Sequence, residues 1–198
     1  GYVLQEGGLF PHRTIADNIA TVPLLEGAPR RQARARALEL MDLVGLDRDM
    51  AGRYPAQLSG GQRQRVGVAR ALANEADILL MDEPFGALDP LVRADLQAEL
   101  IRIREQLGTT ILFVTHDIDE AFLLGDQIAV LRTGGRVAQV GTAQELLSHP
   151  ADDFVADFVG ASRAARPVRI DHRRGGLVVD EAGTPVGTLR EPDQGARP

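Results

Sequence analysis

Two short apolar runs, each followed by polar residues, constrain the fold of this chain more than any other feature. They are ILLMD at residues 78–82 and TILFV at residues 110–114, and a helical pattern from Pro90 to about Leu107 lies between them. A continuous apolar run of this length is typical of a strand that is covered on both faces, and strands that alternate with helices form parallel sheets. The sequence therefore predicts an α/β fold with a buried parallel sheet.

Helical and hairpin patterns surround these runs. Upstream, apolar residues recur at helical spacing over residues 30–46, and LSGGQ at residues 58–62 opens a second helix. Downstream come a helix over residues 117–124, the strand candidates QIAVLR and RVAQVG joined by the turn TGG, and two short helices that end near Gly160. We expect a helix-rich subdomain attached to the sheet.

Composition excludes several classes of protein. The 198 residues contain no cysteine, which excludes a disulfide scaffold and thiolate metal sites. The longest apolar runs are far shorter than the ~20 residues needed to cross a bilayer. The formal net charge of −6 gives no support to nucleic-acid binding, which usually shows a basic excess. We therefore expect a soluble protein with no nucleic-acid partner.

Two adjacent carboxylates, Asp82 and Glu83, stand where the first apolar run ends. At the carboxyl edge of a parallel sheet, where ligands usually bind, Asp82 could hold Mg²⁺ against nucleotide phosphates and Glu83 could polarise an attacking water. A lone Asp-Glu pair is more often an exposed strand end. The buried run before the pair, and Pro84 forcing a turn after it, favour the functional interpretation.

The stretch LSGGQ has two interpretations. Ser59 and Gln62 have the spacing of a capping box, which satisfies free N–H groups at a helix start. Gly60 and Gly61 would then take the first helical positions, where each costs up to about 1 kcal/mol relative to alanine, and a cap gives no reason for them. We favour an anion site, because a helix N-terminus offers a phosphate free N–H donors and a partial positive charge.

Three further residues are weak signals when each is taken alone. Asp89, followed by Pro90, is a good helix N-cap. His116 follows the second apolar run, where it could equally be a packed histidine with a satisfied hydrogen bond. Gln5 is by itself an ordinary polar loop residue.

The order of these motifs is far more specific than any one of them. Gln5, LSGGQ, ILLMDEP, GALD and VTHD follow one another in a way that resembles the ATP-binding cassette (ABC) ATPases, over about residues 1–160. The resemblance assigns the residues as follows: Gln5 to the Q-loop, Ser59 to Gln62 to the signature motif, Asp82 and Glu83 to the Walker B aspartate and the catalytic glutamate, Asp89 to the D-loop, and His116 to the switch histidine.

The resemblance implies a fold, a mechanism and a dimer. The fold is a P-loop NTPase-like parallel sheet with a helical subdomain that carries the signature motif. Two cassettes pair head to tail around two ATP molecules, so that the signature motif of one chain caps the γ-phosphate held by the other. Glu83 activates water, His116 contacts the γ-phosphate, Asp82 and Gln5 hold Mg²⁺, and Asp89 lies beside the nucleotide.

The phosphate-binding loop of that family is not found in these residues. It ends in Gly-Lys-Ser/Thr, and all 22 basic residues of this chain are arginine. In the family the loop lies upstream of the Q-loop, so the resemblance implies a cassette truncated at its N-terminus. We expect the 198 residues alone to be inactive as an ATPase.

Two softer stretches, QEGGLFPHRTIADNIATVPLL and DFVGASRAAR, resemble importer ATPases for quaternary amines such as glycine betaine, carnitine and choline. The resemblance implies a peripheral subunit at the cytoplasmic face of the cell membrane. Its partners would be permease subunits, a second ATPase subunit and, indirectly, a substrate-binding protein. Two alternatives stay open: an ABC ATPase outside transport, and a non-hydrolysing regulatory fragment.

A short appendage over residues 161–198 follows the predicted domain of residues 1–160. Its hairpin signal, LVVDEAGTPVGTL, resembles part of the CBS regulatory modules that follow the cassette in some of these importers. The appendage is rich in arginine: Arg163, Arg166, Arg169, Arg173 and Arg174. They could form a solvated linker or contact an anionic lipid surface.

Overall fold

The chain divides into two compact units, Gly1–Leu124 and Gly125–Pro198. The computed structural model describes residues 1–5, 7–86, 88–160, 169–171, 177–179 and 185–188. None of the described helices combines the length and the apolar character that a membrane span requires. The predicted division of the chain near residue 160 stays a prediction.

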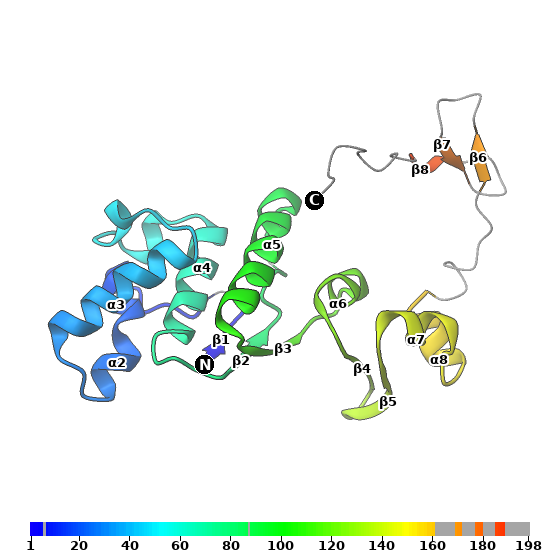
Figure 1. The fold of residues 1–198 in the computed structure, drawn as a ribbon, viewed down its shortest axis with the longest axis horizontal. Helices are drawn as coiled ribbons and strands as arrows, with labels where there is room; N and C mark the ends of the chain where they lie inside the picture. Colours follow the sequence, from blue (N-terminus) through cyan, green and yellow to red (C-terminus); the bar gives the residue numbers. More distant parts are fainter. Residues whose placement is uncertain (6, 87, 161–168, 172–176, 180–184, 189–198) are drawn as a thin grey trace, which may run out of the picture. The chain divides into compact units, whose positions relative to one another are not determined.

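Unit 1 is built on a parallel sheet in the strand order β1-β2-β3 (Figure 1). Its strands are β1 (Tyr2–Val3), β2 (Ile78–Asp82) and β3 (Thr110–Val114). In the register of the sheet, Asp82 lies opposite Val114. The carboxyl ends of β2 and β3 therefore lie side by side, and the prediction of a parallel α/β sheet is confirmed.

The prediction that β2 and β3 are covered on both faces is wrong for the strands of unit 1 as described. On β2, Leu79 and Met81 are buried, whereas Ile78 and Leu80 are 55% and 40% exposed. On β3, Leu112 is 62% exposed. Side chains alternate between the two faces of a strand, so only one face of the described sheet is packed. A continuous apolar run did not distinguish this one-sided arrangement from a fully buried strand.

Helices make up the segment between β1 and β2. They are α1 (Ile15–Ile19), α2 (Thr21–Leu25), α3 (Arg30–Leu43) and α4 (Gly60–Ala71), with short 3₁₀ turns at Arg48–Met50 and Pro55–Gln57. The helix predicted from the spacing over residues 30–46 is thus confirmed as α3, and Gly45, which follows its end, has a φ of +65° that breaks helical geometry.

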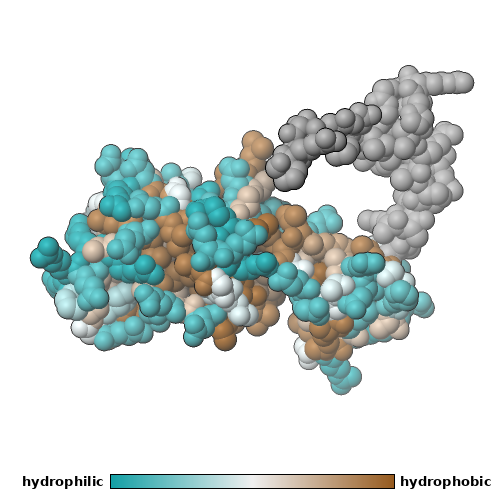
Figure 2. Space-filling model, in the orientation of Figure 1, coloured by the Kyte–Doolittle hydropathy of each residue, from teal (hydrophilic) through white to brown (hydrophobic). Residues whose placement is uncertain are grey.

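Helix α5 (Pro90–Leu107) begins and ends at the predicted residues. Asp89 caps its start by accepting a hydrogen bond from the Val92 amide at 3.1 Å, and Gly108 ends it with a φ of +65°. Figure 2 shows hydrophilic surface next to hydrophobic surface in the region of α5, and Leu91 of this helix is 81% exposed. Helix α6 (Ile118–Leu124) follows β3 and closes unit 1.

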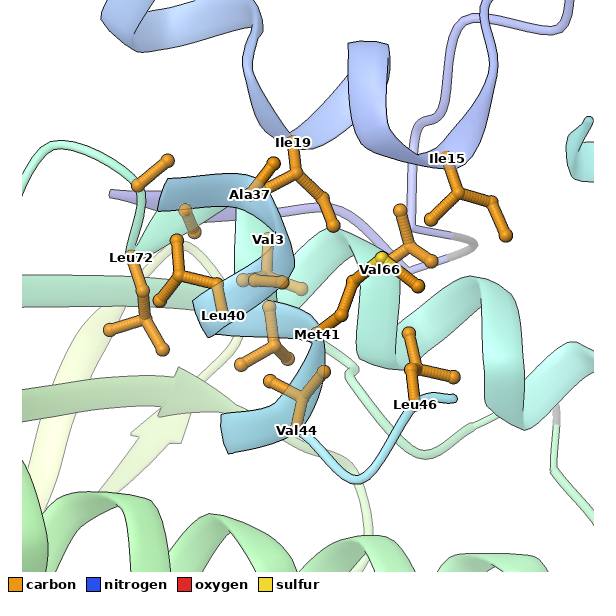
Figure 3. Packing of buried hydrophobic residues seen from close by; sticks show 14 of the residues in the cluster. Val3, Ile15, Ile19, Ala37, Leu40, Met41, Val44, Leu46, Val66 and Leu72 are labelled. Atoms are coloured by element: carbon orange, nitrogen blue, oxygen red, sulfur yellow. The ribbon is translucent and has the colours of Figure 1, made fainter. Parts of the chain in front are cut away.

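The hydrophobic core of unit 1 joins the edge of the sheet to the helices. Figure 3 shows Val3 of β1 among side chains of α1, α3 and α4, including Ile19, Met41 and Val66. These four side chains are fully buried. Because Val3 comes two residues before Gln5, this packing fixes the chain just ahead of the first candidate site residue.

Unit 2 contains both predicted pairs of strands, the one joined by the turn TGG and the hairpin of the tail. Its described elements are the antiparallel pair β4 (Ile128–Arg132) and β5 (Arg136–Gly141), the helices α7 (Ala143–Ser148) and α8 (Asp153–Phe158), and the antiparallel strands β6 (Arg169–Asp171), β7 (Leu177–Val179) and β8 (Pro185–Thr188). Strands β7 and β8 confirm the predicted tail hairpin, and β6 was not predicted. The arginine cluster of the tail, apart from Arg169 in β6, lies outside the described residues.

Candidate functional site

Three of the predicted site residues meet at the carboxyl edge of the sheet. The Gln5 side-chain amide donates a hydrogen bond to Oε2 of Glu83 at 3.0 Å, and Nδ1 of His116 lies 3.2 Å from Oε1 of the same carboxylate. The His116 side chain is 73% exposed and that of Glu83 is 31% exposed. Glu83 thus lies between an amide and an imidazole, with its carboxylate still reached by solvent.

The backbone at Glu83 is strained. Its φ is +42°, a left-handed conformation that costs a residue with a Cβ about 1–3 kcal/mol. The Glu83 amide donates to the carbonyl of Val114 at 2.9 Å, which ties the turn after β2 to the end of β3. Gly86 lies next to the hydrogen bond between Gln5 and Glu83: a Cβ at this position would be 3.4 Å from Oε2 of Glu83 and 3.6 Å from the side-chain nitrogen of Gln5. The surroundings hold Glu83 in a conformation that its own chemistry disfavours.

Asp82, the last residue of β2, is exposed beside this cluster. Among the described residues, no three His, Asp or Glu side chains are grouped so as to hold a metal ion. Mg²⁺ is usually bound through only one or two protein carboxylates, with substrate phosphates and water completing its shell. The carboxylate of Asp82 and the amide oxygen of Gln5 are ligands of the kind that such a site uses, and their role in holding Mg²⁺ stays a prediction.

The signature stretch forms the predicted capping box at the start of α4. The Ser59 hydroxyl accepts from the Gln62 amide at 3.2 Å, and the Gln62 side chain accepts from the Ser59 amide at 2.9 Å. Packing requires a glycine at position 61, which the sequence did not reveal: a Cβ on Gly61 would lie 2.4 Å from Cγ1 of Val92 in α5. A Cβ on Gly60 would lie 3.4 Å from Cδ2 of Leu88 and 3.9 Å from Nη2 of Arg63, which are ordinary contacts. The anion site stays a prediction, for which Gly60 is now the more informative glycine.

The candidate residues fall into two groups. Gln5, Glu83 and His116 are in direct contact, with Asp82 next to them in the chain. Among the described residues, no hydrogen bond or ion pair connects that cluster to the signature stretch (residues 59–62) or to Asp89. Both Ser59 and Asp89 are engaged as helix caps. A role for them at a nucleotide stays a prediction.

Sequence reasoning missed the residues that hold the Gln5 loop. Gly7 and Gly8 have φ values of +75° and +53°, and the half-buried side chain of Arg70 donates to their carbonyls. The pair Gly-Gly directly after Gln5 and Glu6 was a readable turn signal. For Arg70 there was none, because an arginine on a helix usually reads as a solvated residue.

Comparison with known proteins identifies the family of this chain. Residues 1–86 match the family model described as ABC transporter. The chain belongs to the ATP-binding cassette family. In a solved structure of the dimeric ATP-binding cassette MJ0796, in a post-hydrolysis state bound to ADP and Pi, 37% of residues are identical at a TM-score of 0.61. The match covers 72% of this chain and 62% of that one.

Similar relatives include transport ATP-binding proteins. The choline transport ATP-binding protein OpuBA of Bacillus subtilis (strain 168) is 52% identical over 82% of this cassette chain and 42% of its own length. The glycine betaine uptake system ATP-binding protein YehX of Escherichia coli (strain K12) is 55% identical over 82% of this chain and 52% of its own. The trimethylamine N-oxide transport system ATP-binding protein TmoW of Ruegeria pomeroyi is 47% identical over 94% of this chain and 54% of its own length. The chain therefore spans about half the length of these relatives.

Proposed function

We propose that this cassette chain is part of an ATP-binding and ATP-hydrolysing subunit that energises an importer of osmoprotectants such as glycine betaine, carnitine or choline. The single observation that carries the proposal is the convergence of Gln5, Glu83 and His116 at the carboxyl edge of the sheet. The names of the relatives support transport over DNA repair or translation, and they support quaternary amines as the transported class.

The cluster can perform the hydrolytic step. Glu83 accepts hydrogen bonds and is reached by solvent, so it can orient a water and take its proton as the water attacks the γ-phosphate. His116, whose Nδ1 lies 3.2 Å from this carboxylate, can keep Glu83 in place, and as an imidazolium it can also donate from Nε2 to a γ-phosphate oxygen. Bound Mg²⁺ would neutralise developing charge on the phosphates, and Asp82 and Gln5 would hold it.

The start of α4 supplies the other half of the proposed mechanism. Its free N–H groups and the Ser59 hydroxyl would cap the γ-phosphate of an ATP bound to a second copy, and Asp89 would lie at the same interface. Hydrolysis then needs a head-to-tail dimer. The dimer would dock on permease subunits at the cytoplasmic face of the membrane, with a substrate-binding protein serving the permease.

The test uses the ATPase subunit that contains these residues, reconstituted with its permease in liposomes. We expect uptake of a quaternary amine that depends on ATP, and loss of Mg²⁺-dependent nucleotide binding in Asp82→Asn. ATP hydrolysis that does not respond to any quaternary amine would contradict the importer assignment. The 198-residue chain by itself should not hydrolyse ATP, because it contains neither a lysine nor a Gly-x-x-x-x-Gly-Lys-Ser/Thr loop.

A further inference from the structure

The loop that follows Gln5 lies along one stripe of α4. A Cβ on Gly67 would lie 3.0 Å from Cα of Gly7, and a Cβ on Gly7 would lie 2.8 Å from the carbonyl oxygen of Arg63. Arg63, Gly67 and Arg70 are spaced by four and three residues, so they share a face of the helix. The loop therefore follows α4 for two turns at a distance that only glycines permit.

Arg70 clamps this loop to the helix. Its Nη1 donates to the carbonyl of Gly8 at 2.7 Å and its Nη2 to the carbonyl of Gly7 at 2.8 Å. The guanidinium also lies 5.9 Å from the ring centre of Phe10. An arginine is suited to this role because its planar fork presents two parallel donors, whereas a lysine would present a single point of charge.

The position of Arg70 is unfavourable for a cation. Burial lowers the pKa of its guanidinium, because desolvation disfavours the charged form. No ion pair to Arg70 occurs among the described residues, so backbone carbonyls and the Phe10 ring are its recorded partners. A half-buried arginine bound to carbonyls of glycines in a loop, rather than to a carboxylate, serves to hold that loop.

The clamped loop carries Gln5. The Gly7 amide donates to the carbonyl of Leu4 at 2.9 Å, which closes a turn with Gln5 inside it. Arg70 binds the far side of this turn, and β1 holds the near side. The Gln5 side chain then reaches Glu83 at 3.0 Å. At its other end α4 is capped by Ser59, about 16 Å from Arg70 at 1.5 Å per residue.

We propose that Arg70 is a positioning residue that fixes the Gln5 turn to α4, so that the contact of Gln5 with Glu83 depends on where α4 lies. The helix would thereby connect the signature stretch at its start with the hydrolytic cluster. The expected effect on ATP hydrolysis rests on the proposed function. The expected effect on the loop that follows Gln5 rests on the hydrogen bonds of Arg70 alone.

The first test is structural and uses the complete ATPase subunit that contains this chain. In Arg70→Met, the protected amides of the loop should exchange with deuterium about tenfold faster or more, since a hydrogen bond to a charged group is worth at least that factor. These amides are Gly7, Phe10 and Arg13. Arg65→Met is the matched control, because Arg65 also donates from α4 to a backbone carbonyl, that of Val44 at 2.7 Å. It should leave the loop exchange unchanged.

The second test is kinetic. Arg70→Met should lower kcat with little change in KM for ATP, whereas Gln5→Ala should lower kcat at least as much, because it also removes the proposed Mg²⁺ ligand. The double variant should be no slower than Gln5→Ala alone, because Arg70 acts only through Gln5. Arg70→Lys should recover part of the rate, since lysine can still reach one carbonyl. Arg65→Met should keep the normal kcat.

The outcomes separate the inference from the proposed function. Unchanged loop exchange in Arg70→Met, or rate losses that multiply in the double variant, would overturn the inference. If Arg70→Met does not fold, the same readings on Arg70→Lys decide the matter. Faster loop exchange in a subunit whose unmodified form shows no ATPase activity would contradict the proposed function and leave the clamp standing.

Discussion

The hydrolytic cluster and the signature stretch of this cassette are built in opposite ways. Glu83 has a left-handed backbone, and its carboxylate contacts two partners that themselves face solvent. Ser59 and Gln62 form a regular capping box in which each side chain satisfies the other's backbone amide. Folding alone explains the second arrangement and does not explain the first.

The difference teaches how to weigh the two regions as functional sites. A cap and a close helix contact are what any well-folded helix start shows, so the structure at Ser59 is compatible with function without requiring it. Strain at Glu83 costs stability, and the two side chains that its carboxylate contacts are themselves exposed. Such strain is typical of functional sites, where the geometry is needed for chemistry.

The largest effect is expected at Glu83. In the complete subunit, Glu83→Gln should slow hydrolysis by about 10²–10⁴-fold, because a positioned general base contributes that much. ATP binding should persist, since the amide keeps the shape of the side chain. Single-turnover hydrolysis and nucleotide binding measure the two effects. Glu105→Gln, at an exposed position of α5, is the control, and a normal rate in Glu83→Gln would make the carboxylate structural.

Ser59→Arg tests whether the signature stretch is more than a cap. It should stop hydrolysis while a single subunit still binds ATP, because the residue acts on a nucleotide bound by the partner. Thr142→Arg is the matched control, since Thr142 forms the same capping box with Glu145 at the start of α7. Each change should cost about 1 kcal/mol of stability through its lost cap. Equal rates in the two variants would reduce Ser59 to a helix cap.

Glycine at position 83 should stabilise the fold while abolishing activity. Glu83→Gly removes the left-handed strain and should raise the free energy of unfolding by about 1 kcal/mol. Glu75 also has a positive φ, 56°, at an exposed position away from the candidate site. Glu75→Gly should give a similar gain and keep full activity. Urea unfolding of both variants makes the comparison, and a loss of stability in Glu83→Gly would show that its side-chain contacts outweigh the strain.

The smallest effect concerns an exposed ion pair far from either region. The hydrogen bond from Arg48 lowers the pKa of Asp42, and the Arg48 charge adds to this effect. A lowered pKa contributes stability above the ordinary carboxyl pKa of about 3.9 and loses it as the pH falls below that value. Asp42→Asn should therefore be slightly less stable near neutral pH, and its free energy of unfolding should fall less steeply as the pH is lowered. Acid unfolding followed beside Asp95→Asn checks this, and identical acid curves for Asp42→Asn and the unmodified subunit would contradict it.

Local signals predicted the elements of this protein well. The run at residues 78–82 became β2, Asp89 with Pro90 marked the start of α5, and the helical pattern ended at Leu107. Ser59 and Gln62 formed the capping box that their spacing predicts. These features succeed because periodicity, caps and left-handed glycines act within a few residues of the chain.

Contacts between distant segments had to come from the tertiary structure. Gln5 and Glu83 are separated by 78 residues, and the loop of Gly7 and Gly8 meets Arg70 across more than 60. The covered face of β2 could not be read from an apolar run, since such a run contains residues that point to both faces.

The sequence by itself determined the type and order of the elements and, through the order of its motifs, the family. Tertiary structure decided which side chains meet, which face of the sheet is packed, and that Gly61 is needed against Val92. The physical reason is one of range. Hydrogen bonds and steric limits within a turn are set by neighbouring residues, whereas close packing is set by whatever surface the rest of the chain brings to that place.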